Sequence, residues 1–316
     1  MPDYSEYIIK ENDELKFHNH YRGDYTFLCD IFWGEEEAKR IISNQVKAEE
    51  FKGDNPFTRI IIDQDNREIS LQIGIPENEN GEGIIMIRKY LKLLELSYEN
   101  WKINYLTEGY NDVIRFLNKN DYFKDNSTLE RIENFEPNYL KGAWDEPKGA
   151  LISKERKAEI SYEYVNQNIA EIISQGEKLI SRNLKNKIPN DKIPFGGIHI
   201  NEDKGKISLW YTIEPIKLKE WTKSIWPDWE IEFEFWGYEK QYEQIKMKEE
   251  LKKIIGNLEI NATENLKEEI VNSDKEPFFD EPKRTYGFRP RKKDKEMMSI
   301  EFDEIIKKEK KTVPNK

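Results

Sequence analysis

The chain has 316 residues, which is enough for two ordinary domains or for one large domain with a buried core. Its 37% hydrophobic and 12% aromatic residues are typical of folded proteins, and its 36% charged residues with a mean hydropathy of -0.89 indicate a heavily solvated surface. Its apolar runs are about five residues long, against the roughly 20 that cross a bilayer, so the sequence predicts no transmembrane helix.

The first half of the predicted elements runs from residue 25 to residue 118. A strand is expected at Tyr25–Trp33 and a helix at Glu35–Glu50. Two β-prone runs, Thr58–Asp63 and Glu68–Ile75, are joined by polar turn residues and predict a hairpin. A helix follows whose apolar face is formed by Ile84, Ile87, Leu91 and Leu94. After it we expect a strand from Trp101 and an amphipathic segment over 111–118.

The second half repeats this order. Strands at Gly149–Ser153 and Ala158–Val165 are expected to pair, and a long helix is expected at Asn168–Lys187. A hairpin is expected next, formed by Gly196–Asn201 and Lys206–Ile213. An amphipathic helix from Leu218 to Ile225 precedes a strand at Glu230–Phe235 in which acidic and apolar residues alternate. A last amphipathic segment covers 239–255.

An internal resemblance links the two halves. Residues 101–110 (WKINYLTEGY) match 229–238 (WEIEFEFWGY) at an offset of 128. Shorter matches upstream share the same order, and they join 63–73 to 201–211 and 40–44 to 171–175. The common order predicts an α+β fold made by tandem duplication of a β-α-β-β-α-β-α module of about 100 residues, with mainly antiparallel sheets.

The domain boundaries follow from composition. We expect a first module over 1–119, a polar linker over 120–147, a second module over 148–272 and a basic, largely disordered tail over 273–316. Inside the tail, Met298, Phe302, Ile305 and Ile306 have helical spacing, so a short helix that docks on this chain or on a partner is the alternative.

Charge is distributed unevenly along the chain. Residues 283–316 hold 12 Lys or Arg and 6 Asp or Glu, while the remaining residues hold 39 and 56, so the body carries -17 and the tail +6. An acidic body repels phosphate backbones, which argues against double-stranded nucleic acid as its partner and leaves nucleic-acid contact open only for the tail. The acidic charge of the body favours a basic protein partner or keeps the chain soluble.

Metal and cofactor sites have weak support in the sequence. His18, His20 and the distant His199 match no established ligand spacing, and Cys29, the single cysteine, excludes an internal disulfide and a zinc site built of cysteines. The run from Asp63 to Glu68 lacks the glycine of a calcium loop and is more typical of a turn. We therefore expect no metal and no cofactor.

Catalytic residues are equally hard to assign. Gly81-Glu-Gly83 precedes a helix as phosphate-binding loops do, but its acidic neighbours would repel an anion. Cys29 and the serines have no identifiable histidine partner in the sequence. We therefore predict no set of catalytic residues.

An aromatic cluster in the second half is the strongest candidate for an interaction surface. Five tryptophans fall within 27 residues, and Trp210, Trp226 and Trp236 have no aromatic counterpart in the first half. Exposed tryptophans are good interface anchors, although filling a larger core is the other interpretation. Glu230, Glu232 and Glu234 add acidic side chains on one strand face, and these six residues form the predicted interaction surface.

These features favour a non-catalytic protein-binding role, such as an inhibitor, an immunity-type protein or an antitoxin that acts on a basic partner. An enzyme whose active site is dispersed over distant loops is one alternative, and a structural or assembly protein is another. The acidic N-terminus has no apolar signal segment, so a cytoplasmic location is expected.

Overall fold

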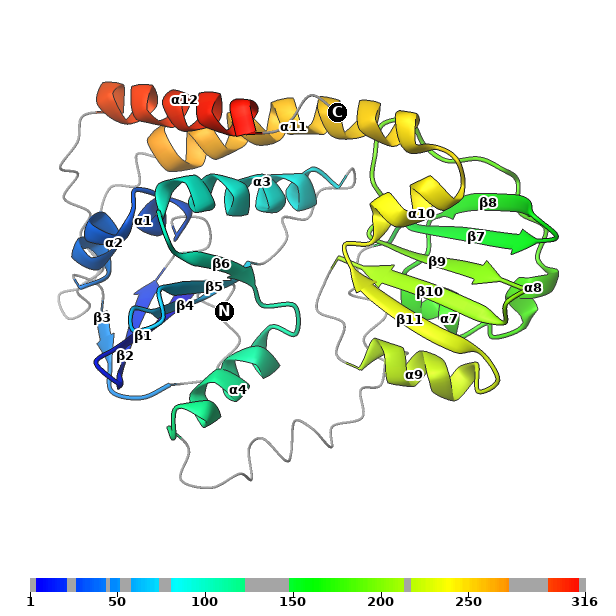
Figure 1. Cartoon of the computed structure of the whole chain (residues 1–316), viewed down its shortest axis with the longest axis horizontal. Helices are drawn as coiled ribbons and strands as arrows, with labels where there is room; N and C mark the ends of the chain where they lie inside the picture. The colour runs from blue at the N-terminus through cyan, green and yellow to red at the C-terminus, as the bar shows by residue number, and fades with distance from the viewer. Residues whose placement is uncertain are drawn as a thin grey trace. The chain divides into compact units, whose positions relative to one another are not determined.

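The computed structural model describes residues 4–21, 27–43, 46–51, 58–73, 81–122, 148–212, 217–272 and 295–312. The chain divides into two compact units, which Figure 1 shows together with the element labels. The first unit comprises Met1–Ile75, Met86–Leu129 and Asn261–Lys316, and the second comprises Pro76–Ile85 and Glu130–Ile260. Each unit contains one mixed β-sheet among its described residues.

The first unit has a six-stranded sheet in the order β3-β2-β1-β4-β5-β6. Its strands are β1 (Tyr4–Glu11), β2 (Glu14–Tyr21), β3 (Val46–Ala48), β4 (Thr58–Asp63), β5 (Glu68–Ile73) and β6 (Lys102–Tyr105). β1 pairs with β4 and β5 pairs with β6 in parallel, whereas the other neighbours are antiparallel. The central strand β4 is buried along its whole length, as expected of a strand covered on both faces.

Buried tyrosines hold helix α1 (Phe27–Phe32) in this unit. The next helices along the chain are α2 (Glu35–Ile42), α3 (Glu82–Ser97) and α4 (Tyr110–Lys119). The Tyr7 hydroxyl donates to the Asp30 carboxylate at 2.6 Å, and the hydroxyls of Tyr90 and Tyr98 donate to carbonyls of α1 at 2.8 and 2.6 Å. These hydrogen bonds satisfy polar groups of a helix that is only six residues long.

The predicted strand at Tyr25–Trp33 is therefore wrong for residues 27–32, which form α1. Their apolar and aromatic composition is typical of strands, but buried tertiary hydrogen bonds and packing outweigh this weak local preference. The hairpin of β1 and β2, in which Glu11 and Glu14 flank a two-residue turn, was not predicted from the sequence.

The second unit has a five-stranded sheet in the order β11-β10-β9-β7-β8. Its strands are β7 (Ala150–Arg156), β8 (Glu159–Val165), β9 (Gly196–Asn201), β10 (Lys206–Tyr211) and β11 (Glu230–Phe235). β7 pairs with β9 and β10 pairs with β11 in parallel, and the other two pairs are antiparallel. The predicted pairing of the strands near 149–153 and 158–165 is confirmed.

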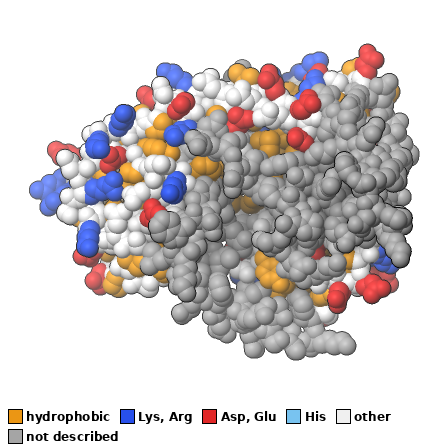
Figure 2. Space-filling model, turned by 180° about the vertical axis from the view of Figure 1, so that it is seen from behind, with side chains coloured by type: hydrophobic (Ala, Val, Ile, Leu, Met, Phe, Trp, Pro, Cys, Tyr) orange, Lys and Arg blue, Asp and Glu red, His pale blue; other side chains and the backbone are white. Residues whose placement is uncertain are grey.

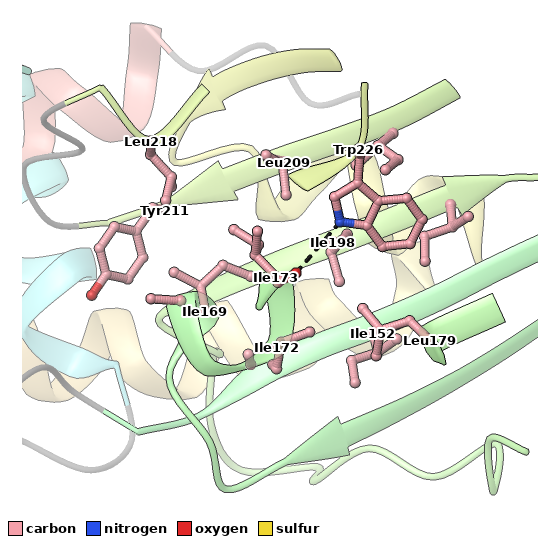
Figure 3. Packing of buried hydrophobic residues seen from close by; sticks show 14 of the residues in the cluster. Ile152, Ile169, Ile172, Ile173, Leu179, Ile198, Leu209, Tyr211, Leu218 and Trp226 are labelled. Carbon is pink, nitrogen blue, oxygen red and sulfur yellow. Dashed lines mark hydrogen bonds between the residues drawn. The ribbon is translucent and has the colours of Figure 1, made fainter. Parts of the chain in front are cut away.

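A hydrophobic core covers one face of this sheet. The covering helices are α7 (Ile169–Ile173), α8 (Lys178–Ser181) and α9 (Leu218–Ile225). Trp226, which follows α9, is fully buried in this core, and its indole Nε1 donates to the Ile173 carbonyl at 3.4 Å (Figure 3). The single helix predicted over 168–187 is thus two short helices, because Gly176 adopts a positive φ of 57° between them.

The amphipathic segment predicted over 239–255 is divided between two helices. α10 (Tyr238–Gln244) and α11 (Lys248–Lys267) are separated at Lys246, whose φ is 60°. A π-helical turn, η1 (Glu268–Asn272), follows α11. Among the described residues no helix is long and apolar enough to cross a membrane. On the side of the chain shown in Figure 2, basic and acidic side chains are interspersed over the described residues.

The α+β class is confirmed, but both sheets are mixed, so mainly antiparallel pairing is not confirmed. Each sheet has two parallel pairs, and these require crossover connections that the alternation of apolar residues does not reveal. Most of the predicted linker, residues 123–147, lies outside the described residues.

The tail contains a packed helix, α12 (Lys295–Thr312). Phe302 is fully buried with its ring centroid 5.6 Å from that of Phe32, and Met298 and Ile306 are also buried. The Lys89 ammonium lies 2.9 Å from the Glu309 carboxylate in a buried ion pair. Residues 295–312 of the predicted, largely disordered tail thus form the docking helix that the sequence left open as the alternative, while 273–294 and 313–316 lie outside the described residues.

The buried ring of Phe302 provides a test of this docking. We expect Phe302→Ala to lower the free energy of unfolding by about 3–5 kcal/mol, because it leaves a cavity in the core of the first unit. Ile300→Ala is the matched control on the same helix, since Ile300 is 56% exposed, and its effect should stay within roughly 0.5 kcal/mol. Equal, small effects of both substitutions on urea unfolding would show that α12 does not dock.

Candidate functional site

A row of polar side chains crosses the second sheet on the face opposite the hydrophobic core. The strand register places Ser153, His199, Ser208 and Glu232 side by side on β7, β9, β10 and β11. Side chains alternate between the two faces of a strand, so their neighbours Ile152, Ile198, Leu209 and Phe233 point into the core instead. The polar row therefore belongs to one face, which helix α10 partly covers.

Gln241 of α10 connects this face by four hydrogen bonds. Its Oε1 accepts from the indole Nε1 of Trp210 at 2.5 Å. Its Nε2 shares its two hydrogens among three acceptors, the carbonyls of Leu151 and Ile198 at 3.1 and 3.0 Å and Ser153 Oγ at 2.8 Å. The side chain is buried, so a single amide satisfies polar groups of three strands that would otherwise be costly to bury.

These contacts favour one protonation state of His199. The indole of Trp210 can only donate, so Oε1 of Gln241 faces it and the NH₂ group faces Ser153. Ser153 Oγ accepts from Gln241, and Nδ1 of His199 lies 2.9 Å from the same oxygen. A neutral His199 with its proton on Nε2 would let the Ser153 hydroxyl donate to Nδ1, so this arrangement favours that tautomer.

The environment of His199 favours this neutral form. Burial lowers the pKa of His199, and the carboxylate of Glu155 opposes that shift only in part. The Nε2 atom is 3.6 Å from the nearer Glu155 oxygen, which is beyond hydrogen-bonding distance, and that oxygen already accepts from Asn201 at 2.6 Å. A donor N–H of a buried ring is thus available at the edge of this face.

A hollow of about 380 Å³ opens beside these groups. It is bordered by β9, β10, β11, α9 and α10 of the second unit, and its polar lining consists of His199, Ser208, Lys219, Glu232, Glu234, Lys240, Gln241 and Gln244. Trp210 and Phe233 add apolar surface. The volume lies within the range of about 300–1,000 Å³ that is usual for ligand sites.

Acidic side chains of β11 line and flank this hollow. The side chains of Glu230, Glu232 and Glu234 are 65%, 42% and 54% exposed. Lys206 bonds Glu232 at 2.5 Å and lowers the pKa of that carboxyl mainly through this hydrogen bond. Lys240 lies more loosely between the acids, 3.7 Å from Glu232 and 3.4 Å from Glu234.

The six residues predicted as an interaction surface are placed differently from one another. Trp226 belongs to the core and to no surface, because the apolar helices of the second unit enclose it. Trp210 is also buried, although it borders the hollow, and the half-buried Trp236 donates from Nε1 to the Thr212 carbonyl at 3.3 Å. The structure brings together Trp210, Glu232 and Glu234 at the hollow.

Gln241, Ser153 and the role of His199 were missed in the sequence analysis. Gln241 lies 88 residues from Ser153, and His199 lies 46 residues from it, so spacing along the chain carries no signal of their contact. One usable signal existed: His199 interrupts the apolar run of β9, which places a polar side chain on a buried strand.

The weaker candidates have structural explanations. Asp63 and Asn66 form a hydrogen-bonded turn, and the Asp65 carboxylate accepts from the backbone of Asn12 and Asp13 at 2.8 and 3.0 Å. Cys29 is buried. Over the described ranges, no group of three or more His, Cys, Asp or Glu side chains is arranged to hold a metal ion.

Comparison with protein families and with known proteins adds no identification. No family model, no curated protein and no solved structure matches this chain.

Removing the amide of Gln241 should destabilise the second unit. Gln241→Leu leaves the Trp210 indole, the Ser153 hydroxyl and two carbonyls without their partner, and we expect a loss of about 2–4 kcal/mol in unfolding free energy. Glu243→Gln, an exposed change on the same helix, is the control. Urea unfolding followed by tryptophan fluorescence measures both, and a neutral Gln241→Leu would refute the network.

The lowered pKa of His199 predicts a pH dependence of stability. The unfolded chain binds a proton near pH 6.5, whereas folded His199 resists it, so its contribution is complete above about pH 6.5 and is lost as the pH falls through the folded pKa. His199→Asn keeps an acceptor for Ser153 but does not titrate. The drop in unfolding free energy between roughly pH 7.5 and pH 5 should be smaller in this variant than in the wild type. Equal drops would contradict the neutral assignment.

Proposed function

We propose that this chain is a non-catalytic protein-binding protein of the inhibitor, immunity or antitoxin type, and that it binds a basic partner through the second unit. The observation that carries the proposal is the row of exposed Glu230, Glu232 and Glu234 on the outermost strand, next to the hollow. Charge complementarity of this kind accelerates association and rejects partners of the wrong sign.

The two units have similar sheets, and a comparison of them shows which features of the second unit differ from the first. Their sheets share the strand order β2-β1-β4-β5-β6 and β8-β7-β9-β10-β11 with the same alternation of antiparallel and parallel pairs. The registers also correspond: the pair Ile8 and Phe17 becomes Ser153 and Tyr162, each shifted by 145 residues. We infer a duplication in which the module begins with a hairpin that the sequence pattern did not reveal.

Under this duplication, the residues that line the hollow differ in polarity from their counterparts in the first unit. At the positions that correspond to its His199, Glu234, Gln241 and Gln244, the first unit has Ile61, Leu106, Val113 and Phe116. These four positions are therefore apolar in one unit and polar in the other. Polar groups on a partly buried face reduce stability unless they are satisfied, so their concentration here favours a binding role.

The Ser153–His199 contact does not favour covalent catalysis. Ser153 is fully buried, and its Oγ contacts both Gln241 and His199, so it is not presented to a substrate. An enzyme with a dispersed site is the second candidate. The feature that favours it is a hollow large enough for a small molecule, lined by both Glu232 and His199, whose pKa burial lowers.

Capture of a partner by the immobilised full chain tests the proposal. We expect one protein from a host lysate to be retained in stoichiometric amount at low salt, and to be largely lost from a Glu230→Gln, Glu232→Gln, Glu234→Gln variant. The ion pairs removed are exposed and contribute at most about 1 kcal/mol each to folding, so this variant should remain folded.

The matched control removes the same charge elsewhere on the second unit, by Glu220→Gln, Glu243→Gln and Glu250→Gln, all of which are exposed. This variant should retain the partner as the wild type does. Equal retention by both variants would place the contact elsewhere, and retention of nothing by any form would bring the enzyme candidate forward.

A further inference from the structure

Strand β11 has an outer edge with hydrogen-bonding groups directed away from the sheet. Glu230 donates its N–H to the Gly205 carbonyl at 2.9 Å, and Trp236 donates to Tyr211 at 3.0 Å, so the even-numbered residues face β10. Backbone groups alternate along a strand, and those of Ile231 and Phe233 therefore point outward. Among the strands that the structure describes, none pairs with this edge.

The other sheet edges differ from β11. On β8, the outward N–H of Tyr164 donates to the Lys187 carbonyl at 2.9 Å and that of Tyr162 to the Asn186 side chain at 3.0 Å. In the first unit, the edge strands β3 and β6 are only three and four residues long. β11 has six residues, so it offers the longest described edge that is not already paired in this way.

The side chains of β11 define what this edge accepts. Glu230, Glu232 and Glu234 lie on one face, and Ile231 with the half-buried Phe233 lies on the other. A second copy of β11 would set glutamate against glutamate, and like charges opposite each other destabilise a strand pair. The acids therefore prevent self-pairing, as charges on edge strands commonly do, and leave the edge open to a strand of opposite charge.

We propose that a partner protein adds a β-strand to β11, in which basic residues alternate with apolar ones. Its basic side chains face the three glutamates, and its apolar side chains continue the face of Phe233. This inference rests on the proposed function and specifies the partner chemistry of the same site. Backbone hydrogen bonds supply affinity in such strand addition, while alternate side chains supply specificity.

The loosely held acids suit this role. Glu230 is 3.3 Å from the Lys206 ammonium and Glu234 is 3.4 Å from that of Lys240, longer than the roughly 2.7–2.9 Å of a strong charge-assisted hydrogen bond. A cation on the partner strand opposite these residues makes shorter contacts without breaking the close Lys206–Glu232 bond. One such side chain lies at the mouth of the hollow, which Glu232 and Glu234 line.

A synthetic peptide tests the inference with the full chain. The probe is acetyl-Arg-Val-Lys-Val-Arg-Val-amide carrying a fluorescent label, and binding is measured by anisotropy. A control peptide of the same composition, with its basic residues grouped at one end, should bind about tenfold more weakly, because it cannot place charges and apolar groups on separate faces. The Glu230→Gln, Glu232→Gln, Glu234→Gln chain should also bind the alternating peptide about tenfold more weakly, and the Glu220, Glu243, Glu250 variant should not differ from wild type.

N-methylation of the peptide separates strand addition from charge attraction without altering the protein. In one isomer the valine amides are methylated, and in the other the amides of the basic residues are methylated. Only one set of amides faces β11, so one isomer should lose binding by about tenfold or more while the other retains it. Which isomer is lost distinguishes an antiparallel from a parallel addition.

The outcomes distinguish this inference from the proposed function. Equal binding of both methylated isomers and of the grouped peptide would overturn strand addition and leave simple charge attraction. Absence of peptide binding by a chain that still captures its partner through the three glutamates would overturn this inference alone. Binding of the peptide by a chain that captures no partner would uphold the edge chemistry and refute the proposed role.

Discussion

The polar face of the second unit depends on the side-chain amide of Gln241. Its four hydrogen bonds join α10 to β7, β9 and β10, and they leave no freedom in the orientation of the amide. The close approach requires Gly197, because a Cβ there would collide with the Gln241 oxygen and the Trp210 indole. This arrangement places Ser153 Oγ 2.9 Å from Nδ1 of His199, and Gln241 also lines the hollow.

The first unit uses the same strand positions in another way. Where the second unit pairs Gly197 with Trp210, the first pairs Arg59 with Gln72, and the Arg59 guanidinium donates to Gln72 Oε1 at 2.7 Å. The guanidinium lies 5.0 Å from the centre of the Tyr110 ring, a cation–π distance. The two units thus have similar strand orders with different buried polar pairs.

The sequence predicted the elements whose signals are local. The hairpins of β4 with β5 and of β9 with β10 follow from alternating apolar residues around polar turns, and the structure confirms both. It failed at α1, where the tyrosine contacts come from distant elements, and at the β1–β2 hairpin, whose strands carry many charged and polar residues. The acidic strand face of β11 was read correctly as a strand, whereas the hollow was not foreseen, because Gln241 and His199 meet it only through tertiary contacts. Trp226, one of the six residues of the predicted surface, is fully buried, as the core-filling interpretation of the tryptophan cluster expects.

We propose that this chain binds a protein partner at the outer edge of β11. Hydrogen–deuterium exchange of the full chain, alone and with its captured partner, tests this proposal. Exchange should slow over 230–235, where the outward amides of Ile231 and Phe233 would gain acceptors, and should change little on α11. Protection confined to other elements, with no change over 230–235, would contradict it.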